Sequence, residues 1–303
     1  MNYKTLLMAS AAVLFSTQAM AQDLTGAFSV PGKGQFMSET TAGLTRTKTS
    51  AKAHGYGTFA SFAEDGRYIS ETLEYGVTDN FSINAGIINH FDADKITDVM
   101  THFDFEGEGD NGFNNDHNFA YQLGAKYNMH FDDFLFQIAP SYNTYDPKSW
   151  YGHRGTDMRW QKNLGIDLKA GLDLGNGLTP YIVYHIDSDI DTAHRELDQF
   201  VKFGVHKYAG KWALDGAIRY EWTKNHVDAW DLGDDGIFKY NKKNTTETWL
   251  DVAGDYYLKD NIALGLYGSY LIDSHDRGYT WGWGEKEHTN FDYEVGLRVK
   301  VLF

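Results

Sequence analysis

The sequence predicts an all-β fold: a transmembrane antiparallel up-and-down β-barrel of 12 strands. The last stretch, 292–303, places apolar side chains on one face and four charged ones on the other, as a strand between lipid and water would. Short turns alternate with longer connections along the rest of the chain. The 303 residues include 16% aromatics, 31 Gly and no Cys. No apolar run after the N-terminus is long enough for a membrane helix, which excludes a helical membrane protein.

The N-terminus has the features of a secretory signal peptide. Lys4 precedes an apolar run from Leu6 to Phe15, and Ala19-Met20-Ala21 provides a small-x-small cleavage site. The run is shorter than the roughly 20 residues that a membrane helix needs. We therefore expect a signal peptide at 1–21 and a single transmembrane barrel domain at 22–303.

Five short turns and six longer connections divide the chain into strands. Gly175-Asn176-Gly177 is the clearest turn, because these residues tolerate positive φ. The stretch 22–33 is interpreted as a polar lead-in before a first strand at 34–47, and loops are expected at 50–66 and 273–289. Both termini then lie at the short-turn end, as in barrels with short periplasmic turns and long extracellular loops. The short turns are expected at 78–80, 130–133, 175–177, 209–211 and 259–261.

Aromatic residues cluster near both strand ends, which predicts two interfacial girdles. The girdle beside the short turns is Tyr75, Phe81, Tyr127, Phe134, Tyr208, Trp212, Tyr256 and Phe303. The girdle beside the long loops is Tyr142, Tyr184, Trp222, Trp249, Tyr270 and Tyr293.

The same alternation assigns a set of polar side chains to the lumen. Nine acids and six bases give this wall a net charge of minus three, which predicts a mild cation preference. The predicted lumen-lining residues are Glu74, Lys126, Asp167, Lys169, Asp173, Lys202, His206, Asp215, Arg219, Glu221, Asp251, Asp255, Asp292, Glu294, Arg298 and Lys300.

A terminal strand that ends on Phe303 resembles the C-terminal signature of Gram-negative outer-membrane barrels. This resemblance implies that Phe303 is an assembly signal for the barrel-assembly machinery. The stretch Pro31-Gly32-Lys33-Gly34, with 74–80, looks like outer-membrane transporters associated with phenol meta-degradation, and the layout is similar to small monomeric porins such as OmpG. These resemblances imply a channel for passive diffusion of small hydrophilic solutes, surrounded by outer-membrane lipid and lipopolysaccharide.

Two other classes of function stay open. A barrel hydrolase of the lipase type would need a motif like His-x-Ser-Asn-Gly, but the stretch 185–189 lacks the Asn-Gly and has different spacing. His206 faces the lumen with no Ser near it in sequence. The acids and His of outer-membrane proteases have possible counterparts in Asp187, Asp189, Asp191 and His194. The other class is a loop-mediated adhesion or structural protein. We assign no catalytic residue.

Two acidic, Gly-containing runs, at 104–110 and 231–236, resemble calcium-binding loops in composition only, because neither has the spacing of a helix-loop-helix calcium site. We expect no metal site and no cofactor. The net charge of −15 argues against nucleic acid as a partner.

Two interpretations of the loop histidines stay open. They could make gating sensitive to pH, because imidazoles gain charge in mildly acidic water, or they are simply solvated polar residues. Those expected in the outer loops, beside acidic residues, are His54, His102, His117, His153, His194, His226, His275 and His288.

Overall fold

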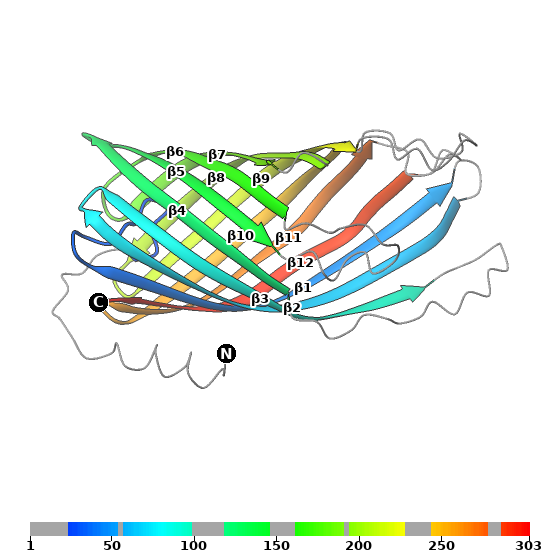
Figure 1. The fold of residues 1–303 in the computed structure, drawn as a ribbon. Helices are drawn as coiled ribbons and strands as arrows, with labels where there is room; N and C mark the ends of the chain where they lie inside the picture. Colours follow the sequence, from blue (N-terminus) through cyan, green and yellow to red (C-terminus); the bar gives the residue numbers. More distant parts are fainter. Residues whose placement is uncertain are drawn as a thin grey trace.

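The computed structural model is a closed barrel of 12 antiparallel strands, which confirms the predicted fold class. It describes residues 24–53, 57–98, 118–145, 161–190, 194–227, 244–277 and 286–303. Each strand pairs with its sequence neighbours, and β1 pairs with β12 to close the cylinder (Figure 1). Within these ranges, no helix is long and apolar enough to cross a membrane. The strands are β1 (Phe36–Ala53), β2 (Gly57–Thr78), β3 (Phe81–Asp98), β4 (Asn118–Phe131), β5 (Phe134–Tyr145), β6 (Gln161–Leu172), β7 (Leu178–Asp189), β8 (His194–Ala209), β9 (Trp212–Val227), β10 (Asn244–Lys259), β11 (Ile262–Arg277) and β12 (Lys286–Leu302).

The five predicted short turns join β2–β3, β4–β5, β6–β7, β8–β9 and β10–β11 at one end of the barrel, termed the short-turn end. The C-terminus lies at this end too (Figure 1). In the β6–β7 turn, Gly175, Asn176 and Gly177 have φ of 73°, 49° and 72°, the left-handed conformation that the sequence indicates. The opposite end is termed the long-loop end.

The strands extend further toward the long-loop end than predicted. β1 and β2 occupy most of the expected loop 50–66, with Ser50 paired to Ser61. β11 and β12 likewise occupy part of the expected loop 273–289. Apolar alternation marks only the part of a strand in contact with hydrocarbon, whereas backbone pairing continues into polar sequence. The predicted signal peptide and the two acidic runs lie outside the described residues.

The barrel is apolar outside and polar inside. On the exterior, Phe203 and Leu297 are each 61% exposed and Leu266 is 60% exposed. On the interior, Glu74 and Asp255 are each only 2% exposed. This is the reverse of a water-exposed barrel, and it is the polarity of a barrel surrounded by lipid.

Outward-facing aromatic rings contact one another near both ends. At the short-turn end, Phe36 lies 4.6 Å from Tyr75 and 5.8 Å from Phe303, measured between ring centroids. Toward the long-loop end, the rings of Tyr184 and Trp222 are 6.5 Å apart.

Two predicted girdle residues point inward instead. Tyr208 packs edge-on against Tyr257 with a centroid distance of 5.4 Å, and Trp249 is 9% exposed beside Arg219. Tyr208 is two residues from the lumen-facing His206, and Trp249 is two residues from the lumen-facing Asp251, so alternation places both inside. The girdle prediction used only their closeness to the strand ends and ignored this alternation.

Candidate functional site in the barrel lumen

All but one of the predicted lumen-lining residues occupy inward-facing positions on the strands. The exception is Asp173, which follows the end of β6 and is exposed. Its carboxylate accepts a hydrogen bond from the Gly175 amide at 2.9 Å. The chain is already turning at this position, so strand alternation no longer determines where the side chain points.

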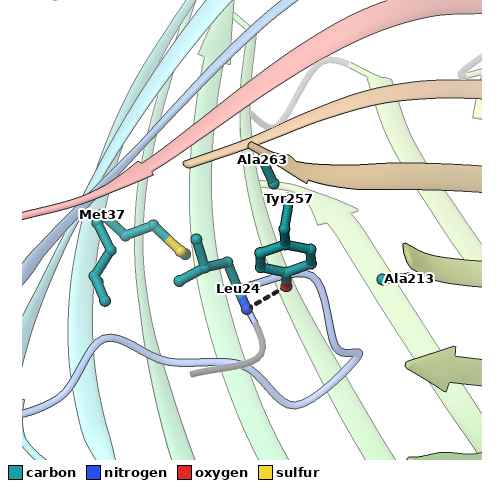
Figure 2. Close-up of a cluster of buried hydrophobic side chains, with 6 residues drawn as sticks. Leu24, Met37, Ala213, Tyr257 and Ala263 are labelled. Atoms are coloured by element: carbon teal, nitrogen blue, oxygen red, sulfur yellow. Dashed lines mark hydrogen bonds between the residues drawn. The ribbon is translucent and has the colours of Figure 1, made fainter. Parts of the chain in front are cut away.

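The N-terminal segment 24–31 lies inside the barrel at the short-turn end, which corrects its interpretation as a polar lead-in. Leu24 is 2% exposed and packs with Met37, Ala213, Tyr257 and neighbouring inward-facing residues (Figure 2). The Leu24 amide donates a hydrogen bond to the Tyr257 hydroxyl at 2.9 Å. The segment therefore narrows the lumen at this end.

Polar wall residues hold the backbone of this segment. Asn128 Nδ2 donates to the Phe28 carbonyl at 2.6 Å, and Gln137 orients the Asn128 amide from 2.7 Å. Lys169 Nζ contacts the Ala27 carbonyl and Lys300 Nζ the Leu24 carbonyl, both at 3.4 Å. Two cations predicted to line a water path thus also anchor the segment. The spaced apolar residues at 24, 28 and 30 were the sequence signal that could have indicated that this segment packs inside the barrel.

A cavity of about 440 Å³ lies inside the barrel, with Thr25 and Ala27 of the segment in its wall. Four acids and four bases line it, so its charge is balanced. They are Asp167, Asp215, Asp251 and Glu294, with Lys169, Lys202, Arg219 and Arg298.

Most of the lumen bases form ion pairs with acids of other strands. Lys126 Nζ lies 2.7 Å from Glu74 Oε2, Lys202 Nζ lies 2.9 Å from Asp251 Oδ2, and Arg298 Nε donates to Asp255 Oδ1 at 2.7 Å. Lys300 Nζ is 3.3 Å from Glu39, an inward-facing acid that the sequence analysis did not include. Such pairing reduces the field that each charge projects into the lumen.

Arg219 has the most constrained position of these bases. Its guanidinium lies 5.7 Å from the ring centroid of Phe200 and 5.1 Å from that of Trp249. It also contacts Glu221 at 3.1 Å and Asp251 at 3.5 Å. Aromatic faces attract cations, so the planar group is held by both rings and carboxylates. The inward-facing Phe200 and Trp249 could have been found by extending the alternation of their strands.

Two lumen histidines face carboxylates. His185 Nδ1 is 2.6 Å from Asp167 Oδ1, and His206 Nδ1 is 3.6 Å from Asp215 Oδ2. The Tyr181 hydroxyl also donates to Asp215, at 2.7 Å. His185 pairs in register with Phe200 of β8, six residues before His206, so the histidines belong to different layers of the lumen.

Of the four possible counterparts of protease residues, the structure describes only one side chain, that of Asp187. Asp187 faces the lumen next to His185. The side chains of Asp189 and His194, and all of Asp191, lie outside the described residues.

Among the side chains that the structure describes, acids predominate in the part of the lumen toward the long-loop end. Asp187 of β7 lies directly opposite Asp198 of β8, and Glu221 of β9 lies opposite Glu247 of β10. Like charges in such pairs repel. Arg219 and the Trp249 indole, which donates to Glu247 at 3.1 Å, offset part of this repulsion. Among these four acids, the sequence analysis assigned only Glu221 to the lumen.

In the described part of the chain, no group of three or more His, Cys, Asp or Glu side chains is arranged to hold a metal ion.

Phe303 lies at the junction of the first and last strands. Its amide and carbonyl both bond to the backbone of Phe36, at 2.8 and 2.7 Å. Its ring also stacks on that of Phe36. The terminal residue thus completes the pairing of β12 with β1.

No protein-family model matches the sequence. No curated protein matches it either. Among solved structures, two similarities have TM-scores below 0.5. One is to the outer membrane protease OmpT from Escherichia coli, with 10% identity over 89% of this chain and 97% of that one and a TM-score of 0.39. The other is to the NanC porin, with 10% identity over 84% of this chain and 98% of that one and a TM-score of 0.43. The chain is also similar to an outer membrane channel from Pseudomonas putida F1, with 12% identity over 92% of this chain and 98% of that one and a TM-score of 0.60. The chain therefore shares the barrel fold of that channel.

Proposed function

We propose that this protein is an outer-membrane channel through which small hydrophilic solutes diffuse passively. The observation that carries the proposal is the polarity of the barrel: apolar residues cover the outside, and ionised groups surround a cavity of about 440 Å³ inside. Charged groups inside a barrel are costly unless they are paired or hydrated, and eight of them line this cavity. No catalytic residue is part of the proposal.

The N-terminal segment limits the size of the solute. Thr25 and Ala27 form part of the cavity wall, and polar side chains of the barrel hold the segment in place. A lumen narrowed in this way favours small molecules over oligomers. The protein then acts as a narrow diffusion channel.

A mild cation preference fits the charges. Without Asp173, the predicted wall still holds eight acids and six bases. The cavity itself is balanced, and the excess acid lies toward the long-loop end. Carboxylates around an aqueous path favour cations, whereas ion pairing keeps the effect small.

We also infer location and partners from this fold. The apolar exterior fits outer-membrane lipid and lipopolysaccharide, and the features of 1–21 fit a cleaved signal peptide of a Gram-negative bacterium. The channel from Pseudomonas putida F1, which is an outer membrane protein, supports this location. The terminal strand would be the part that the barrel-assembly machinery binds.

Single-channel recording in a planar lipid bilayer tests the proposal. Purified, refolded protein is expected to give discrete open levels in KCl. A barrel that never conducts would contradict the channel. The second candidate, a barrel hydrolase, rests on the 2.6 Å contact between His185 and Asp167. Cleavage of a lipid or peptide that His185→Ala abolishes, without conductance, would favour it.

A further inference from the structure

Four residues at the junction of the chain's two ends form one continuous row across four strands. Gly43 of β1 pairs with Gly296 of β12. In the neighbouring strands, Tyr68 of β2 pairs in register with Gly43, and Tyr267 of β11 pairs in register with Gly296. The row reads Tyr68, Gly43, Gly296, Tyr267.

The two tyrosine rings lie across the two glycines, inside the barrel. A Cβ atom added to Gly43 would stand 2.5 Å from Tyr68 Cε1, and one added to Gly296 would stand 2.5 Å from Tyr267 Cζ. Only glycine leaves room for the rings. The two hydroxyls meet over the glycine pair, and that of Tyr68 also donates to the carboxylate of Glu294.

The junction differs from every other strand pair. The other eleven pairs join strands that are consecutive in sequence, so a connection links them, whereas β1 and β12 come from opposite ends of the chain. β1 is already attached to β2 by side chains, since Ser38 and Thr40 donate to Glu71 and Thr41 bonds to Ser70. Its register against β12 needs a separate determinant.

We propose that Tyr68 and Tyr267 form a clasp over Gly43 and Gly296 that sets the register in which the barrel closes. A slip of one residue would turn the inward face of a strand outward. A slip of two would preserve the faces but place Glu294 or Arg298 opposite Gly43. A side chain would then occupy the space of a ring, and the hydroxyls would lose their partners. The clasp therefore penalises the slip that alternation alone permits.

The chain offers a matched control away from the junction. Tyr181 of β7 faces Gly204 of β8, and a Cβ at Gly204 would collide with its ring. The Tyr181 hydroxyl donates to Asp215 of β9 at 2.7 Å. A tyrosine ring lies over a glycine of the neighbouring strand here too, but β7 and β8 are consecutive in sequence, so the chain itself links them.

The test compares Tyr68→Phe and Gly43→Ala with Tyr181→Phe and Gly204→Ala during refolding from urea into lipid vesicles. Closure is followed by the appearance of the form that migrates differently in unheated SDS gels. We expect the clasp variants to close at least about tenfold more slowly than the controls, because both sets lose the same kind of local contact but only the clasp variants also lose the determinant of the closing register. Equal rates in the two sets would overturn the proposal.

Register is read separately by cross-linking, which keeps the test valid if a clasp variant folds in poor yield. The chain has no Cys, so introduced thiols react alone. Ala42→Cys with Leu297→Cys reports the native register, because these outward-facing residues pair. Ala42→Cys with Val295→Cys or Val299→Cys reports a slip of two. Clasp variants should shift dibromobimane cross-linking toward the slipped pairs, and an unchanged ratio would also overturn the proposal.

Discussion

Lys126 Nζ lies 2.7 Å from Glu74 Oε2 inside the barrel, where Glu74 is only 2% exposed. Ser82 Oγ donates to the other Glu74 oxygen at 2.5 Å. We expect Lys126→Met to lower the free energy of unfolding by about 3 kcal/mol, because it leaves a buried carboxylate without its cation. The double variant Lys126→Met, Glu74→Gln should recover much of the loss. Urea titration of vesicle-embedded protein measures both, and a double variant less stable than the single one would contradict the expectation.

Loosening the N-terminal segment should enlarge the pore. Tyr257→Phe removes the hydroxyl that binds the Leu24 amide and contacts Thr25. Loss of about 1 kcal/mol of hydrogen bonding should raise the occupancy of wider states roughly fivefold. Single-channel conductance measures this. Tyr256→Phe is the matched control, because that neighbour faces outward against Trp212; equal behaviour of the two variants would argue against a role for the segment.

The reversal potential in a KCl gradient should indicate a mild cation preference at low salt and a smaller one near 1 M, where screening acts over only about 3 Å. The double variant Asp187→Asn, Asp198→Asn should weaken the preference, because it neutralises the pair that faces the lumen toward the long-loop end. Asp173→Asn, at the exposed short turn, should leave it nearly unchanged. Anion preference in the wild type would contradict the charge argument.

Acidification should weaken the cation preference, as high salt does. Lowering the pH from about 7.5 to about 5 adds positive charge to imidazoles and protons to carboxylates, so the cation preference must fall. Of the histidines expected in the outer loops, four lie instead in strands β8, β9, β11 and β12, namely His194, His226, His275 and His288. The His275 side chain is exposed and lies 3.2 Å from Asp273. Open probability should change over this range if these contacts gate the channel. His275→Gln tests that residue's share, and identical recordings at both pH values would remove the idea.

Deletion of Phe303 should reduce the outer-membrane yield of heat-modifiable protein several-fold. It removes both the backbone bonds to Phe36 and the ring stacked on it. Phe131→Ala is the control, since that ring is 61% exposed beside another short turn and contacts Phe136. A normal yield from the deletion would contradict an assembly role.

Period-two alternation, together with turn-forming residues such as Gly175-Asn176-Gly177, was enough to predict the barrel and its turns. A residue such as Val299 must face lipid if Lys300 faces water, and this local rule extends along each strand. It could not reveal features that depend on distant residues. The position of Leu24 depends on Tyr257, 233 residues away, and the meeting of Tyr68 with Tyr267 depends on how the two ends of the chain pair. Asp173 was misassigned because alternation does not say where a strand stops.

The segment inside the short-turn end makes the lumen asymmetric along its axis. One end is constricted by residues 24–31, and the other carries opposed carboxylates. A charged pore that is narrow at one end passes ions more readily under one sign of voltage, because mobile ions accumulate in it under one polarity and are depleted under the other. The barrel should accordingly rectify, with a current–voltage curve that is not symmetric about zero. The sense of rectification would reveal which way the protein has inserted into a bilayer.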